Sequence, residues 1–280
     1  MLHPEFHIPP HDAGHPKAHM TLSQDAAKQG PLVGLFVTCL VDLFRPSVGF
    51  AAIKLLEAGG ASVEVPFTQT CCGQPAFNSG DRADAVALAR NVIESFERFD
   101  YVVAPSGSCA GMIRRHYPEL LGSDPDLAHR ADALAAKTFE LTSFLVNVLR
   151  QTRVQANFAG TVTYHDSCSS LRELGIAASP RKLLASVDGL TLTELAEREV
   201  CCGFGGAFSV KYPAISTAIL EAKLRSILAT GAKTVLAADL GCLMQIAGGL
   251  AREKSGVEAR HVAEVLADMT DVPAIAAPRR

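Results

Sequence analysis

The chain carries one cysteine pattern twice: a single cysteine, an adjacent pair followed directly by glycine, and a final single cysteine. The first cysteine is separated from the pair by 31 residues in one set and by 32 in the other. Together the two sets use all eight cysteines of the chain. The sets are Cys39, Cys71, Cys72 and Cys109, and Cys168, Cys201, Cys202 and Cys242. Chance placement of eight cysteines would rarely give this order, so the pattern predicts an internally duplicated fold.

The sequence around the cysteines repeats as well. The segments "LVGLFVTC" (32–39) and "TVTYHDSC" (161–168) are both short apolar or β-branched runs that end in cysteine, as expected of buried strands. Further on, "ELTSFLVNVL" (140–149) corresponds to "RHVAEVLADM" (260–269). We therefore predict a tail over residues 1–31, a first cysteine-rich half over 32–155 and a second over 156–280.

Helical and strand patterns alternate within each half. Apolar spacing, proline and glycine signals predict helices over 46–58, 82–99, 180–187 and 213–229, and strands over 61–66, 101–106, 190–195 and 234–239. This alternation predicts an α/β fold of two duplicated βαβ-type halves with parallel sheets, related by a pseudo-twofold axis. Ligands collect at the carboxyl ends of parallel strands. The cysteines are therefore expected there, in two equivalent sites that face each other across a cleft.

Composition excludes several classes of partner. The chain has 280 residues, 20% of them charged, and a formal net charge of −3 without a basic stripe, so we expect no nucleic-acid partner.

No apolar run is long enough for a transmembrane segment, and the N-terminus lacks the pattern of a secretory signal. We predict a cytoplasmic protein. Thiols stay reduced in that compartment, which favours metal binding or catalysis over a disulfide framework.

Four convergent thiols in each half suggest a metal site. Soft thiolates select zinc, copper(I) or iron–sulfur clusters. Structural zinc usually uses two short C-x₂₋₄-C knuckles, whereas the long spacings and the adjacent pairs here suit a cluster in which neighbouring sulfurs bind different irons. Gly73 and Gly203 leave room for such a core. Zinc in one or both halves, a dithiol–disulfide pair and simple buried cysteines are the alternatives.

Several motifs carry a family resemblance. They are "FVTCLVDLFRPSVG" (36–49), "QTCCGQPAFNSGD" (69–81), "APSGSCAGM" (104–112), "YHDSCSSLRELG" (164–175) and "CCGFGGAFSVKYP" (201–213). The duplicated arrangement resembles the cysteine-rich CCG domain that occurs in heterodisulfide reductase, in the iron–sulfur component of glycolate oxidase and in the lactate utilization protein A family. It is most similar to the last, over about residues 32–269.

This resemblance implies an iron–sulfur electron-transfer subunit of a complex that oxidises L-lactate to pyruvate. It implies one cluster in each half, of the [4Fe-4S] type, held by the four cysteines of that half. It also implies companion iron–sulfur and accessory subunits, and a 2-hydroxy acid as the small molecule handled. The alternatives are a disulfide-reducing iron–sulfur enzyme of the heterodisulfide reductase type and a zinc-stabilised binding module in a redox assembly. Whether this chain is itself an enzyme stays open.

One departure from the family pattern concerns the cluster type. The wider pattern ends in C-x-x-C, but the last positions here are Met112 and Gln245. Each half therefore offers four thiolates instead of five, which suits a four-thiolate [4Fe-4S] cluster or a site with a nonprotein ligand. We interpret Met112 as a core residue in preference to a weak ligand.

Other residues near the cysteines are candidates for supporting roles. His165 precedes Cys168 at a predicted strand end, so we consider it as a catalytic base, with an ordinary hydrogen-bonded core histidine as the alternative. Arg45, Arg172 and Lys211 could attract a carboxylate, although surface solvation explains them equally well.

Two further features carry less functional weight. The "GFGG" run (203–206) lacks the spacing of a dinucleotide loop. Five histidines recur every four residues among the prolines of the tail, which predicts a flexible segment with incidental affinity for Ni, Cu or Zn. They are His3, His7, His11, His15 and His19.

Overall fold

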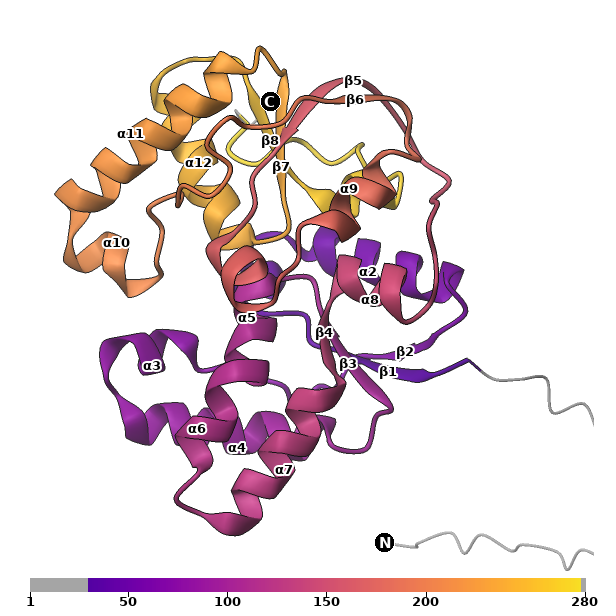
Figure 1. Ribbon diagram of the computed structural model, residues 1–280, viewed down its shortest axis with the longest axis vertical. Coiled ribbons are helices and arrows are strands. Elements are labelled where there is room, and N and C mark those ends of the chain that lie inside the picture. The colour runs from indigo at the N-terminus through magenta and orange to yellow at the C-terminus, as the bar shows by residue number, and fades with distance from the viewer. Residues whose placement is uncertain (1–29, 278–280) are drawn as a thin grey trace, which may run out of the picture.

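The computed structural model describes residues 30–277 and contains two four-stranded parallel sheets with the same topology. The strand orders are β2-β1-β3-β4 and β6-β5-β7-β8, and every neighbouring pair is parallel. In Figure 1 the two sheets lie in two successive parts of the molecule, each with its own helices. The predicted duplicated α/β fold is confirmed. The five tail histidines lie outside the described residues.

The half that contains β1–β4 has helices on both sides of its sheet. Its elements are β1 Leu32–Leu35, α1 Cys39–Phe44, α2 Pro46–Ala58, β2 Ser62–Glu64, α3 Gln74–Ser79, α4 Arg82–Phe96, β3 Tyr101–Ala104, α5 Gly107–Gly111, the π-helix η1 Met112–His116, α6 Tyr117–Leu121, α7 Pro125–Lys137, β4 Thr138–Glu140 and α8 Leu141–Asn147.

The half that contains β5–β8 repeats this order with fewer helices. Its elements are β5 Asn157–Tyr164, the π-helix η2 Ser169–Glu173, α9 Ala178–Leu184, β6 Asp188–Leu192, α10 Ala207–Lys211, α11 Pro213–Ala229, β7 Thr234–Ala237, α12 Leu240–Arg252, β8 Glu258–His261 and α13 Val262–Leu266. Between its third and fourth strands the first half has α5, η1, α6 and α7, where the second half has the single helix α12.

Every predicted helix and strand is present, but most of them end earlier than predicted or are shifted by a few residues; for example, α4 ends at Phe96 and β3 at Ala104. Helices α2 and α11 have the predicted bounds. The strands predicted to run to Cys39 and Cys168 stop at Leu35 and Tyr164 instead. Each cysteine lies beyond the strand, where a helical segment begins. The fourth strand of each sheet was not predicted, because β4 and β8 are only three and four residues long and each leads directly into a helix.

The two halves share one apolar core. Helix α13 of the second half packs on α2 of the first, and α8 of the first half packs on α9 of the second. Buried residues from both halves, such as Val48 and Val265, belong to one hydrophobic cluster. The last helix of each half thus packs on the first crossover helix of the other. This reciprocal packing fixes the orientation of the two sheets, and their carboxyl ends meet around α5 in Figure 1.

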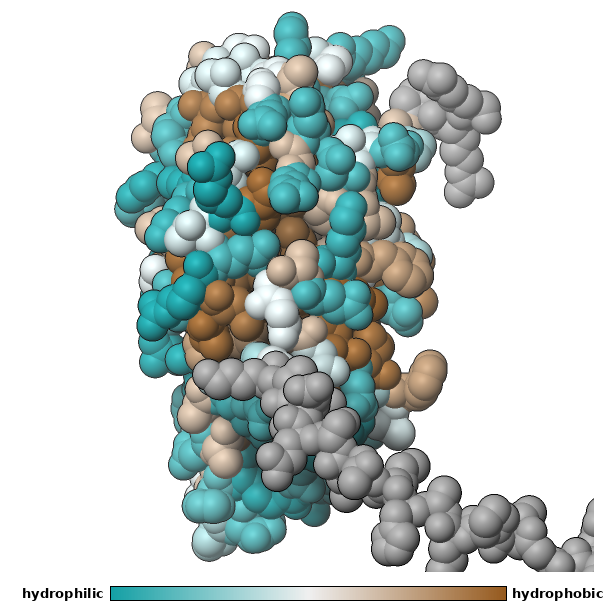
Figure 2. Space-filling view, turned by 90° about the vertical axis from the view of Figure 1, so that its right-hand side faces the viewer, coloured by the Kyte–Doolittle hydropathy of each residue, from teal (hydrophilic) through white to brown (hydrophobic). Residues whose placement is uncertain are grey.

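Within residues 30–277, no helix combines the length and apolar character needed to cross a lipid bilayer. On the face shown in Figure 2, polar residues are spread among smaller apolar areas. Most large apolar side chains lie in clusters between the sheets and their helices and between the two halves.

Candidate metal centre

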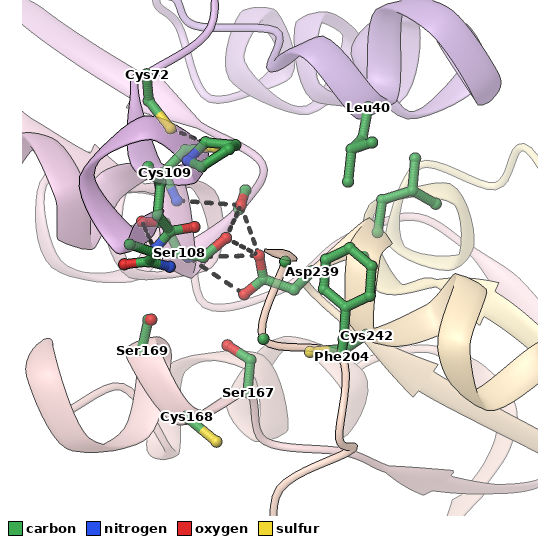
Figure 3. Close-up of a pocket in the computed structure, with 18 of the residues that line it drawn as sticks. Leu40, Cys72, Ser108, Cys109, Ser167, Cys168, Ser169, Phe204, Asp239 and Cys242 are labelled. Carbon is green, nitrogen blue, oxygen red and sulfur yellow. Dashed lines mark hydrogen bonds between the residues drawn. The ribbon is translucent and has the colours of Figure 1, made fainter. Parts of the chain in front are cut away.

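All eight cysteines line one cavity between the two halves. Its volume is about 670 Å³. In Figure 3, Cys72 and Cys109 of the first half and Cys168 and Cys242 of the second lie around Asp239. The reason is topological: each cysteine follows a strand of a parallel sheet, and the carboxyl ends of both sheets open into the same space.

In the first half, three loops deliver four thiols. Cys39 begins α1, Cys71 and Cys72 precede α3, and Cys109 lies in α5. The Sγ atoms of Cys39 and Cys71 are 3.8 Å apart, and those of Cys72 and Cys109 are 3.5 Å apart. The four sulfurs therefore form two close pairs, each of which joins one cysteine of the adjacent pair to a cysteine more than thirty residues away.

The second half has the same arrangement. Cys168 precedes η2, Cys201 and Cys202 lie before α10, and Cys242 lies in α12. The thiols of Cys202 and Cys242 lie within 4.8 Å of each other. The backbone N–H of Gly203 donates to the Sγ of Cys201 at 3.3 Å, a contact of the kind that tunes cluster potentials.

The glycine after each cysteine pair has a conformation that other residues rarely adopt. Gly73 and Gly203 both have φ of +83°, which is the left-handed region where glycine carries no steric penalty. A Cβ at Gly203 would also lie 2.4 Å from the carbonyl oxygen of Ser216. The sharp turn that exposes both thiols of each pair thus depends on glycine.

Thr38, directly before Cys39, is strained. Its φ of 76° is unusual for a β-branched residue, and its side chain accepts a hydrogen bond from the N–H of Val41 at 3.4 Å. Thr38 is buried and lines the cavity. Such strain persists where the surrounding structure imposes it, often at functional sites, and here it lies directly before the first cysteine of the set.

The thiols influence one another's ionisation. Hydrogen bonds from Cys39 and then Cys72 lower the pKa of Cys71 to about 3. Hydrogen bonding to Cys71, followed by burial, raises the pKa of Cys39. The same relationship, in the same direction, holds between Cys201 and Cys168. In each half the first cysteine of the adjacent pair is therefore the favoured thiolate, and a bound cation would stabilise further thiolates beside it.

This donor set fits a thiolate-bound metal centre. All eight cysteines are free thiols, five of them half-buried and three buried, and each half brings four of them to the cavity. Four sulfurs in each half satisfy the ligand count of a [4Fe-4S] cluster. They would also satisfy that of a zinc ion.

The two positions where the wider pattern has a fifth cysteine do not supply a ligand. Met112 is fully buried in the apolar core of the first half, as expected. Gln245 donates from Nε2 to the hydroxyl of Ser216 at 3.1 Å, and that hydroxyl donates to the carbonyl of Gly203. Gln245 therefore supports the turn that carries Cys201 and Cys202.

His165 lies behind the second set of thiols. It is fully buried and does not line the cavity. Burial, followed by the nearby Lys223, lowers its pKa to about 4. Its ligand atom lies within 4.8 Å of the thiols of Cys202 and Cys242. Its role as a catalytic base stays a prediction.

The three basic residues considered as carboxylate binders do not line the cavity. Arg45 donates to both carboxylate oxygens of Glu264, at 2.8 and 3.0 Å. Arg172 donates to the carbonyl of Glu199. Among the described residues, no arginine or lysine lines the cavity, whose ionisable side chains other than cysteine are His116, Glu173 and Asp239.

Sequence reasoning missed the polar contact between the two sets. The buried carboxylate of Asp239 accepts hydrogen bonds from the hydroxyls of Ser106 and Ser108, both at 2.6 Å, and from the N–H of Ser108. Alignment of "APSGSC" with "AADLGC" would have placed Ser106 and Asp239 at equivalent positions, but it could not show that they touch.

Comparisons with known proteins agree with the duplicated pattern. The cysteine-rich domain family CCG matches residues 33–114 and 162–247. The chain is 52% identical to a lactate utilization protein A from Exiguobacterium, covering 84% of this chain and 97% of that protein. It is 50% identical to one from Halalkalibacterium halodurans, with 84% and 96% covered, and 49% identical to one from Bacillus subtilis, with 84% and 98% covered.

A solved structure supports the fold alone. The crystal structure of a hypothetical protein from Helicobacter pylori superposes with a TM-score of 0.62 at 13% identity. The match covers 87% of this chain and 51% of that one. Such similarity extends to the arrangement of strands and helices and says nothing about the chemistry at the cavity.

Proposed function

Because the chain belongs to the lactate utilization protein A family and contains two CCG cysteine-rich domains, we propose that it is an iron–sulfur electron-transfer subunit of a complex that oxidises L-lactate to pyruvate. The observation that carries this proposal is the convergence of eight cysteines, four from each half, on one cavity. The proposed companions are further iron–sulfur and accessory subunits, and the proposed compartment is the cytoplasm.

We assign one [4Fe-4S] cluster to each half. Cys39, Cys71, Cys72 and Cys109 hold the first, and Cys168, Cys201, Cys202 and Cys242 hold the second. A bound cluster of this kind supplies one-electron exchange. The chain contributes thiolates at fixed positions, glycine turns that leave space beside the sulfurs, and a backbone donor at Gly203.

The charge of the cavity supports electron relay over lactate binding. A lactate carboxylate is usually held by arginine or lysine, and among the described residues the lining has neither. It contains the carboxylates of Glu173 and Asp239 instead, which would repel the substrate anion. We therefore propose that lactate is oxidised on a companion protein of the complex. The two electrons released with two protons, as lactate becomes pyruvate, then pass one at a time through this chain.

Anaerobic purification with iron, zinc and acid-labile sulfide analysis tests the cofactor assignment. We expect a brown protein with several irons and sulfides per chain and visible absorption that dithionite bleaches. Colourless protein that holds one or two zinc ions after attempted iron–sulfide reconstitution would instead support the zinc-stabilised module.

Rapid mixing with the companion subunits tests the relay. The visible absorption of this chain should bleach when L-lactate is added to the assembled complex, and it should persist when L-lactate is added to this chain alone. Bleaching of the isolated chain by L-lactate would move the oxidation step to this chain.

A further inference from the structure

His165 has no hydrogen-bond partner in its buried position. The side chain is fully buried, and neither ring nitrogen has a partner among the described residues. Buried polar groups are nearly always hydrogen-bonded, and an orphan in a native core calls for an explanation such as a ligand that is absent from the structure. A ring nitrogen of His165 and the thiols of Cys202 and Cys242 lie within 4.8 Å of one another, so an iron held by either thiol would be within reach of the imidazole.

The first half has an apolar residue at the corresponding place. Phe36 lies three residues before Cys39, as His165 lies three residues before Cys168. The backbone N–H of Phe36 donates to the carbonyl of Val103, and that of His165 donates to the carbonyl of Leu236, the matching residue of β7. Phe36 is fully buried against Phe96. The imidazole is therefore a feature of the second half alone.

A buried lysine, Lys223, lies near the imidazole of His165. Lys223 is the eleventh residue of α11, and Val92 is the eleventh residue of α4. Both side chains are fully buried, and the Nζ of Lys223 donates to the carbonyl of Glu197 at 2.9 Å. A buried ammonium needs nearby negative charge, and the thiolates of the second set supply it. The second half thus replaces a buried Phe–Val pair with a histidine and a cation.

We propose that His165 is an iron ligand of the second-half centre, in addition to the four thiolates, so that one iron of that [4Fe-4S] cluster has two protein ligands, while the first-half centre has thiolates alone. This inference rests on the proposed iron–sulfur function. His165 takes the place of the missing fifth cysteine, since Gln245 is engaged with Ser216. A neutral imidazole adds less negative charge than a thiolate, and histidine ligation raises cluster potentials elsewhere. The second-half centre should therefore have the higher reduction potential and hold the electron first.

Pulsed EPR of the dithionite-reduced full-length protein tests the ligand directly. Samples are prepared with histidine at natural abundance or ¹⁵N-labelled, so the wild-type measurement does not depend on any variant folding. We expect a nitrogen coupling of the size found for directly bound imidazole, which changes with the isotope. His165→Phe, which restores the first-half residue, should lose this coupling although the other eight histidines remain labelled. His165→Cys should lose the coupling, keep its iron and lower the second-half potential.

The outcomes separate the two proposals. Two reduced clusters without a directly bound nitrogen in the wild-type protein would overturn the His165 assignment and leave the electron-transfer function intact. The same holds if the coupling survives in His165→Phe, because another histidine would then be the ligand. Failure to obtain any iron–sulfur cluster after anaerobic reconstitution would overturn both proposals.

Discussion

The carboxylate of Asp239 accepts a 2.6 Å hydrogen bond from the hydroxyl of Ser106, and these two residues occupy equivalent positions in the duplicated fold. Each lies three residues before the last cysteine of its set and stands at the start of the helix that carries that cysteine. The Ser106 hydroxyl also accepts from the N–H of Cys109. Asp239 makes no such bond to its own helix, so its carboxylate serves the other half. The contact therefore links the two thiol sets across the pseudo-twofold axis.

Replacement of Asp239 by asparagine should affect both stability and potential. Asp239→Asn weakens three hydrogen bonds to a buried carboxylate, and hydrogen bonds to charged groups contribute about 1.5–3 kcal/mol each. Tm should therefore fall. Because reduction adds negative charge, loss of a buried anion between the two sets should also raise both reduction potentials. Anaerobic thermal unfolding and redox titration measure the two effects.

Ser106→Ala is the matched control for this prediction. It removes one hydrogen bond and leaves the charge of Asp239 in place, so Tm should fall with much smaller changes in potential. Equal potentials in Asp239→Asn and the wild-type protein would contradict the electrostatic role of Asp239.

The ion pair between Arg45 and Glu264 should stabilise the packing of the two halves. The Glu264 side chain is fully buried, and that of Arg45 is 10% exposed. Removal of one partner from a buried pair leaves an uncompensated charge and typically costs about 3–5 kcal/mol. Arg45→Ala should therefore lower Tm strongly. The double variant Arg45→Ala/Glu264→Gln should recover part of the loss, and a double variant less stable than Arg45→Ala would show that the buried charge is not the cause.

The two equivalent glycines should differ in their tolerance of alanine. In both, alanine must adopt the left-handed conformation, at about 1–2 kcal/mol. At Gly73 the new Cβ would make only ordinary contacts, the nearest at 3.4 Å, whereas at Gly203 it would lie 2.4 Å from a backbone oxygen. Gly203→Ala should therefore lower Tm and iron content more than Gly73→Ala. Similar losses in the two variants would show that conformational strain alone decides the cost.

Serine substitutions of equivalent cysteines should remove the spectroscopic signal of one centre at a time. Cys202→Ser should remove the second-half cluster signal and about half of the iron, because a serine oxygen is a harder and poorer ligand for a cluster than a thiolate. Cys72→Ser should remove the other signal. Iron analysis and EPR of the two anaerobic proteins provide the test. Survival of both signals in either variant would mean that the assignment of four cysteines to each half is wrong.

The duplicated fold could be predicted because its signals are local or periodic. The strand segments and the helical spacing follow from residues close together in the chain, and the C, CC, C order is recognised because it occurs twice with nearly the same spacing. Predicted strand ends at Cys39 and Cys168 were wrong because Thr38 caps α1 and Ser167 accepts a hydrogen bond from the N–H of Ser170 in the following helical turn, and an apolar run does not show where pairing stops. The short strand β8 escaped detection because its hydrogen bonds to β7 come from the tertiary fold.

The sequence by itself determined that two equivalent sets of four thiols exist and that each follows the strands of a parallel sheet, because spacing and strand direction suffice for that conclusion. Only the tertiary structure decided that Asp239 links the two sets, that Arg45 is occupied by Glu264, and that His165 is left without a partner beside two thiols. These relationships join residues of different elements, some of them more than 200 positions apart. They depend on how the two halves pack, which no local pattern encodes.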